Sequence, residues 1–183
     1  MISHKQLKKI NKKGFTLVEI LIYISVLTVI CAAIISFLFW AIKTNAKSRA
    51  AAEVSDNARR AMETMFYEIR QANSVYAPTS VFGANPGQLS LETKISPPDN
   101  ETKTYNDFYL AGGKLYLKRE GMLPEQITSD QVRVSNLIFK YLGSSGNLAS
   151  VQIDLKVEYA DLSGRPEYQA EINLISSVNL KGY

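Results

Sequence analysis

The segment Lys12-Lys13-Gly14-Phe15-Thr16-Leu17-Val18-Glu19 joins a lysine-rich N-terminal region to a long apolar run. Five lysines, two of them in this stretch, come before Gly14, and one acid, Glu19, follows it. Behind Glu19, residues 20–42 contain no charged side chain. A carboxylate deep in a membrane helix costs about 2.5–3.5 kcal/mol on insertion scales. The position of Glu19 is therefore the feature of this sequence that most needs a functional explanation.

The uncharged run has the length of a membrane span. Residues 20–42 supply roughly the 20 apolar residues that a helix needs to cross a bilayer. The run is too long for the apolar region of a typical secretory signal, and no A-x-A-like site closes it. Clustered lysines hold their end of such a segment in the cytoplasm. We expect a single-pass membrane helix, with the residues after Ile42 on the side of the membrane away from the cytoplasm.

The same helix is predicted to continue beyond the membrane. Residues 15–77 contain neither glycine nor proline, the two strongest helix breakers. Further along, apolar residues recur at spacings of three and four and charged residues occupy the other positions, which is typical of a half-buried helix. The apolar set is Val54, Ala58, Ala61, Met62, Met65, Ile69 and Ala72, and the charged set is Arg59, Arg60, Glu63, Glu68 and Arg70. We expect one helix from Phe15 to about Asn73.

The remainder of the chain has strand patterns. Residues 74–87 contain two prolines and two glycines and are predicted to be loop, and residues 88–94 form a short strand candidate. Residues 104–110 and 114–120 flank paired glycines, which predicts a β-hairpin. The apolar phase then switches near Ser135-Asn136, which indicates a β-bulge.

Two further strands complete the pattern. Apolar and polar residues alternate strictly from Val151 to Tyr159, as in an antiparallel strand with one wet face. The last strand is predicted over Tyr168, Ala170, Ile172, Leu174 and Val178.

The predicted fold class is α+β: a long N-terminal helix, its first half in the membrane, packed on a mostly antiparallel β-sheet. A sheet with one apolar face must cover it, and the apolar face of residues 54–72 is the available cover. The predicted division is a leader over 1–14, a transmembrane part over 15–43, an amphipathic helical extension over 44–75 and a β-rich domain over 76–183.

Composition argues against several classes of function. The formal charge is +4, but residues 1–14 hold five of the 21 basic residues and none of the 17 acidic ones, so the rest carries a charge of −1. We therefore expect no direct contact with nucleic acid. The only cysteine, Cys31, cannot form an internal disulfide, and the only histidine, His4, is in the leader. Catalysis by histidine and His/Cys metal clusters are not expected outside the membrane.

No catalytic residue, metal site or cofactor is predicted, and we expect no enzyme. The acid pair Asp99 and Glu101 lies in a turn, and Asp154 and Glu158 lie on the wet face of a strand. Residues 110–114 are interpreted as a hairpin and not as a phosphate-binding loop. The hydroxyl residues of the apolar run are expected to contact other helices or to bond to backbone carbonyls; they are Tyr23, Ser25, Thr28 and Ser36.

Residues 14–19, after a lysine-rich leader and before an apolar helix, resemble the class III signal of type IV pilins and type II secretion pseudopilins. The resemblance implies that a prepilin peptidase cuts between Gly14 and Phe15 and that the amine of Phe15 is then N-methylated. It also implies other pilins or pseudopilins, an inner-membrane assembly platform and the lipid bilayer as partners. The implied location is the bacterial cytoplasmic membrane, followed by a periplasmic or extracellular filament.

The helix end at residues 61–72 and the sheet-rich remainder resemble the minor, J-type pseudopilins and related minor pilins. No acidic loop matches the calcium site of the major pseudopilin. A single cysteine excludes the disulfide loop of major pilins, and Ser36 stands where these tend to have a proline. The expected role is to prime or cap a filament tip in type II secretion, pilus adhesion or DNA uptake. The alternatives are a major filament subunit and an unprocessed, signal-anchored receptor or enzyme.

The resemblance gives Glu19 a predicted partner. Near the helix N-terminus, the helix dipole offsets part of the cost of the Glu19 carboxylate. Full compensation needs a cation, and removal of the leader would expose one as the free amine of Phe15. We expect Glu19 to pair with the N-terminal amine of an adjacent subunit and to set the axial step between helices.

Overall fold

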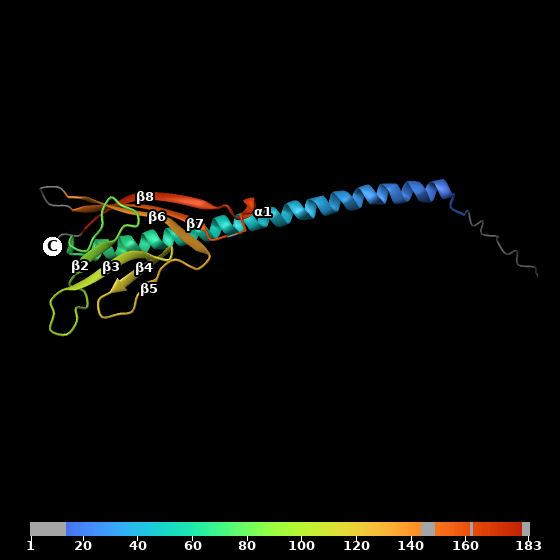
Figure 1. Cartoon of the computed structure of the whole chain (residues 1–183). Coiled ribbons are helices and arrows are strands. Elements are labelled where there is room, and N and C mark those ends of the chain that lie inside the picture. Colours follow the sequence, from blue (N-terminus) through green and yellow to red (C-terminus); the bar gives the residue numbers. More distant parts are fainter. Residues whose placement is uncertain (1–13, 144–148, 162, 181–183) are drawn as a thin grey trace, which may run out of the picture. The chain divides into compact units, whose positions relative to one another are not determined.

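The computed structural model describes residues 14–143, 149–161 and 163–180 (Figure 1). The chain divides into two compact units with a boundary between Ile42 and Lys43. One helix, α1 (Leu17–Gln71), contributes residues to both units. Its bounds lie two residues inside the helix predicted from Phe15 to Asn73, and it has no interruption, since no glycine or proline falls within it.

In the first unit the side chains of α1 are almost all exposed. The large apolar residues from Leu17 to Ile42 each leave about half or more of their surface uncovered. By its length and composition, α1 is the one helix in the described part of the chain that could cross a membrane. An apolar surface of this size needs an apolar environment, such as a lipid bilayer, or a protein partner, because water does not solvate it favourably.

In the second unit α1 has the two predicted faces, with one exception. All seven residues of the predicted apolar stripe are buried. Of the predicted charged set, Arg59, Arg60, Glu63 and Arg70 are exposed. Glu68 was expected among the exposed residues and this is wrong: it is 7% exposed.

The first sheet has five antiparallel strands in chain order: β1 (Ser74–Val75), β2 (Leu89–Thr93), β3 (Thr104–Ala111), β4 (Lys114–Arg119) and β5 (Glu125–Gln126). The hairpin of β3 and β4 turns at Gly112 and Gly113, as predicted, and both glycines have positive φ. The segment predicted as loop, residues 74–87, contains β1, because its first two residues pair with the end of β2.

The second sheet has three antiparallel strands: β6 (Val132–Leu142), β7 (Ser150–Tyr159) and β8 (Glu171–Asn179). The register of β6 shifts between Val134 and Asn136, which confirms the predicted bulge. Tyr168 and Ala170 were predicted in the last strand and this is wrong, because β8 begins at Glu171. Tyr168 ends a short 3-10 helix, η1 (Pro166–Tyr168), and proline at its start favours this helical turn over a strand.

The sequence predicts one sheet, and the structure has two. Figure 1 shows β2–β5 on one side of the C-terminal part of α1 and β6–β8 on the other. The two sheets meet where the Val134 amide donates to the Gly113 carbonyl at 2.8 Å. Both sheets and the helix contribute to a single core, with Met65 of α1, Phe108 of β3 and Phe139 of β6 among its fully buried side chains. The α+β class is confirmed.

Candidate functional site

The N-terminal end of α1 is capped by its own side chains. Thr16 directly precedes the helix, and its hydroxyl accepts a hydrogen bond from the Glu19 amide at 3.3 Å. A threonine followed three residues later by glutamate is the capping-box sequence pattern, and the bond to Thr16 satisfies one of the amides that the first helical turn leaves unbonded. Glu19 also places a negative charge in the first turn, where the helix dipole favours it.

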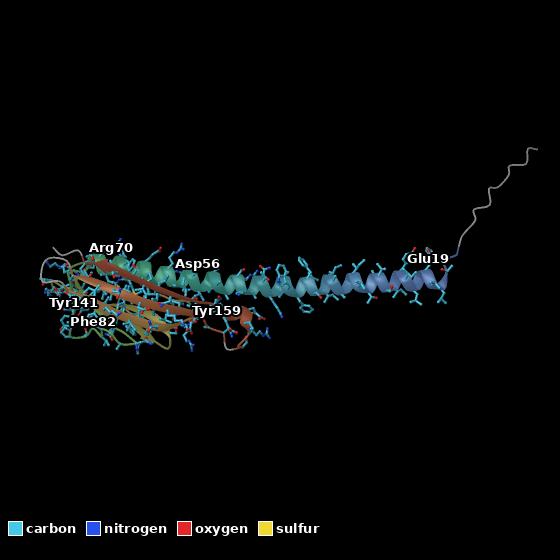
Figure 2. All side chains as sticks on the ribbon, turned by 90° about the horizontal axis from the view of Figure 1, so that it is seen from above. Glu19, Asp56, Arg70, Phe82, Tyr141 and Tyr159 are labelled. Carbon is cyan, nitrogen blue, oxygen red and sulfur yellow. The ribbon has the colours of Figure 1, made fainter. Side chains whose placement is uncertain are left out.

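The Glu19 carboxylate has a partner in its own chain. The Tyr23 hydroxyl, one turn further along, donates to Glu19 Oε1 at 3.0 Å. The Tyr23 ring meets the Phe15 ring edge to face, with ring centroids 6.2 Å apart. Figure 2 shows Glu19 at the start of the helix. The Tyr23 hydroxyl is therefore bonded to a side chain of its own helix and not to the backbone, and the expected contact of Tyr23 with other helices stays a prediction.

The other hydroxyls of the apolar run behave as predicted. Ser25, Thr28 and Ser36 each donate to a backbone carbonyl three or four residues earlier, at 2.7–2.9 Å. Such bonds satisfy a hydroxyl without a second chain, so these residues require no separate functional explanation.

The peptide bond between Gly14 and Phe15 is accessible. Both residues precede the helix, and Phe15 is 68% exposed. A Cβ atom added to Gly14 would meet nothing within 4 Å. Nothing in the described part of the chain therefore prevents an enzyme from reaching this bond.

The second unit contains a partly buried ionic cluster around Glu68 that was not predicted from the sequence. Arg119 Nη2 donates to Glu68 Oε1 at 2.7 Å, and Asn106 Nδ2 donates to Glu68 Oε2 at 2.9 Å. Arg119 Nη1 reaches Glu125 at 3.0 Å. The hydrogen bond to Glu68 raises the pKa of the Arg119 guanidinium, so the guanidinium stays charged. The cluster ties α1 to β3 and β4.

A second polar contact also fixes α1 to the sheet region. Asn57 is 1% exposed, and its Oδ1 accepts from the Ser129 amide at 2.8 Å. The Ser129 hydroxyl donates to Glu53 at 2.8 Å, and Asn57 donates to the same carboxylate. Glu53 and Asn57 are one helical turn apart and are therefore neighbours on the helix. This polar pair beside the apolar stripe is the sequence feature from which the contact could have been predicted.

Neither of the two acid pairs considered as catalytic candidates, Asp99 with Glu101 and Asp154 with Glu158, forms a catalytic arrangement. Asp99 and Glu101 are exposed in a turn. Asp154 accepts from Asn136 at 3.2 Å, and Glu158 forms ion pairs with Arg133 and Lys156. Lys114, at the end of the predicted hairpin, donates to the carbonyls of Ser129 and Val132. Asp154, Glu158 and Lys114 each have a partner that accounts for their position, and Asp99 and Glu101 are surface charges.

Cys31 is exposed on the apolar part of α1 and forms no disulfide. Within the described residues, no group of three His, Cys, Asp or Glu side chains could hold a metal ion.

Comparison with known proteins finds one similarity, and it covers the N-terminal end of α1 and the residues before it. A family model described as the prokaryotic N-terminal methylation motif matches residues 9–35. No curated protein and no solved structure matches the chain. The chain carries the class III signal of the type IV pilin and pseudopilin family, and its long helix with antiparallel sheets is a pilin-like architecture.

Proposed function

We propose that this protein is a minor pilin or pseudopilin, made as a membrane-anchored precursor and assembled at or near the tip of a filament. The methylation motif over residues 9–35 carries the proposal. It is supported by the accessible bond between Gly14 and Phe15 and by the exposed apolar surface of α1 from Leu17 to Ile42. The filament belongs to a type II secretion system, a type IV pilus or a competence pilus.

In this proposal, a prepilin peptidase cleaves after Gly14 and the new amine of Phe15 is N-methylated. The protein works by assembly with other pilins or pseudopilins on an inner-membrane platform, and it has no enzymatic activity. The proposed domain division is the cleaved leader over 1–14, the membrane part over 15–43, the helical extension over 44–75 and the β-rich domain over 76–183. The β-rich domain faces away from the cytoplasm before assembly.

The minor role is supported by two features of the sequence. A single cysteine excludes a disulfide loop, and the uninterrupted α1 has Ser36 where major pilins tend to have proline. A major filament subunit is the competing proposal. Quantitative mass spectrometry of the isolated filament separates them, because a major subunit would outnumber every other subunit.

Mass spectrometry of the protein extracted from membranes tests the processing. We expect the mass of residues 15–183 plus one methyl group. The intact precursor mass in a cell with an active prepilin peptidase would contradict the proposal and would favour an unprocessed, signal-anchored protein.

Glu19 is proposed to pair with the N-terminal amine of the adjacent subunit. Glu19→Val should leave membrane insertion intact and abolish incorporation into the filament, because the amine of the neighbour would lose its counter-ion. Cell fractionation reports insertion, and immunoblotting of the filament fraction reports incorporation. Normal incorporation of the variant would overturn this role.

A further inference from the structure

The strand β8 has one hydrogen-bonded edge and one free edge. The Leu180 amide donates to the Ala149 carbonyl, and the Tyr159 amide donates to the Ala170 carbonyl, each at 2.9 Å. In an antiparallel pair, hydrogen-bonded and non-hydrogen-bonded residues alternate. The even-numbered residues of β8 therefore direct their backbone groups to β7. The odd-numbered residues Glu171, Asn173, Ile175, Ser177 and Asn179 direct theirs outward.

The corresponding edge of β6, on the opposite side of the same sheet, is covered. The Gly83 and Gly87 amides donate to the Phe139 and Leu137 carbonyls at 2.9 and 2.8 Å, and the Val134 amide bonds to Gly113. In the described part of the chain, no backbone group outside β7 bonds to residues 171–179. As far as the described residues show, one edge of this sheet, that of β8, is therefore available to another strand.

Apart from one charged residue at its start, Glu171, the free edge lacks the features that usually protect an edge strand. β8 is nine residues long, pairs with β7 without a register shift, and contains no proline or lysine. Natural proteins usually protect an exposed edge with a bulge, a proline, a lysine or a very short strand. The terminal strands of the other sheet, β1 and β5, have two residues each.

A groove runs along this edge. It has a volume of ≈ 320 Å³ and is lined by Ser55, Arg59, Met62, Glu63 and Phe66 of α1 and by residues 172 and 174–176 of β8. Successive residues of a strand point to opposite faces, so a groove lined by the consecutive residues Leu174, Ile175 and Ser176 follows the edge of the strand. An additional strand would therefore bond to β8 and pack its side chains on α1.

We propose that β8 is a docking edge that receives one extended strand from a different subunit of the same filament. This inference rests on the proposed function. The strand would gain main-chain hydrogen bonds from the outward residues of β8, and apolar contacts with Met62 and Phe66 would fix its register.

Charge defines the chemistry of the partner. Arg59 and Glu63 both line the groove, and within the described residues neither takes part in an ion pair. They are four residues apart, about 6 Å along the helix. Residues on the same face of a strand repeat at about 6.6 Å. The fitting strand has an acidic and a basic residue two positions apart, facing Arg59 and Glu63, and an apolar residue beside Phe66.

Backbone amide hydrogen exchange at residue resolution tests the proposal on the full chain in detergent and on the isolated filament fraction. We expect the amides of Asn173, Ile175 and Ser177 to exchange freely in detergent and to slow about ten-fold in the filament, since a hydrogen bond there lowers the exchange-competent population. The amides of Ile172, Leu174 and Ser176 are the internal control, because they bond to β7 in both states.

Two outcomes would overturn the docking edge: protection of the odd-numbered amides already in detergent, or no added protection in the filament. If the chain never enters a filament, the proposed function fails with it. If it is incorporated without protection at β8, only the docking edge fails.

Proline substitution gives an independent test. Ser177→Pro removes an outward N–H group and leaves the hydrogen bonds to β7 in place, whereas Ser177→Ala keeps that N–H group. We expect the filament fraction to contain about ten-fold less of the proline variant than of the alanine variant. Equal incorporation would overturn the proposal. If the proline variant does not fold, the exchange experiment on the unmodified chain still decides.

Cross-linking identifies the source of the strand. The double variant Cys31→Ser and Ile175→Cys carries one thiol, next to the free edge. With a thiol-to-amine reagent we expect a cross-link to a different subunit of the filament, identified by mass spectrometry. A disulfide between two copies of the variant at position 175, formed as the main product, would overturn the assignment to a different subunit.

Discussion

At the scale of single residues, the carboxylate of Glu19 retains capacity for a second partner. Its Oε1 accepts from the Tyr23 hydroxyl, and a carboxylate offers about four acceptor sites. The bond to Tyr23 fixes the direction of the carboxylate and leaves Oε2 able to accept from an amine. The hydroxyl therefore complements the proposed pairing with an adjacent subunit and does not replace it.

Tyr23→Phe tests this arrangement. The variant keeps the ring that contacts Phe15 and removes only the hydroxyl. We expect normal membrane insertion and about ten-fold less incorporation into filaments, because a hydrogen bond to a charged group contributes about 1.5–3 kcal/mol. Immunoblots of membrane and filament fractions measure both quantities. Equal incorporation of Tyr23→Phe and the unmodified protein would show that the hydroxyl has no part in assembly.

Glu68 shows the energetic importance of one residue in the second unit. Glu68→Ala leaves Asn106 and Arg119 without their shared acceptor. We expect a loss of about 2–3 kcal/mol in the free energy of unfolding; this range allows for the partial exposure of Arg119 and its remaining bond to Glu125. Urea denaturation of the full chain in detergent measures the loss.

Glu63→Ala is the matched control for this prediction, since Glu63 lies on the exposed face of the same helix. It should change the free energy of unfolding by less than about 0.5 kcal/mol. Equal effects of the two substitutions would mean that the cluster around Glu68 contributes no net stability.

At the scale of elements, the hairpin of β3 and β4 depends on two glycines that differ in their surroundings. Both have positive φ, 58° at Gly112 and 74° at Gly113. A Cβ atom at Gly112 would meet nothing within 4 Å, whereas one at Gly113 would lie 2.8 Å from Arg133 Cγ. Conformation alone restricts the first glycine, and conformation and space together restrict the second.

Asparagine tolerates positive φ better than other residues with a side chain. Gly112→Asn should therefore change the free energy of unfolding by less than about 0.5 kcal/mol, and Gly113→Asn should lower it by about 1 kcal/mol more. Thermal melts of the two variants, monitored by circular dichroism, give the comparison. Equal melting temperatures would show that Arg133 moves aside at no cost.

The sequence predicts elements well where a periodic signal lies within one segment. The helix ends, the hairpin and the bulge between Val134 and Asn136 all follow from local patterns. The division into two sheets does not, because alternation shows which face of a strand is buried and not which strand lies beside it. Tyr168 was misassigned for a different reason. The alternation of apolar residues was extended through Tyr168, although Pro166 begins a helical turn there.

The candidate site was predictable to a similar extent. The motif around Gly14 and Phe15 is contiguous, so the sequence contains the whole signal. The burial of Glu68 depends on Arg119, which is 51 residues away, and helical periodicity cannot reveal such a partner. The hydrogen bond from Tyr23 to Glu19 joins residues four positions apart. It could have been predicted from the sequence, because such pairs are neighbours on a helix.

At the scale of the whole molecule, removal of the leader would reverse the charge of the protein. The full chain has a pI of about 9.1 and a formal charge of +4. Residues 15–183 contain 16 basic and 17 acidic residues, and their one new amine is balanced by the C-terminal carboxylate. The body of the protein is therefore close to neutral and slightly acidic.

Isoelectric focusing follows this change. Protein from cells with an active prepilin peptidase should focus below pH 7, because its net charge at that pH is −1. Protein from cells that lack the peptidase should focus near 9.1. N-methylation should not move the mature band, since a methylated amine keeps its charge. A basic band in both cells would contradict cleavage.

The covered edge of β6 limits how many chains can join the second sheet. A ribbon of strands grows without end only if each added unit has two open edges, one to receive and one to offer. Among the described residues, the loop that contains Gly83 and Gly87 occupies one edge of this sheet, and β8 is the edge that remains open. With respect to strand pairing the second sheet is monovalent: one added strand saturates it, and self-propagating β-aggregation through this sheet cannot proceed.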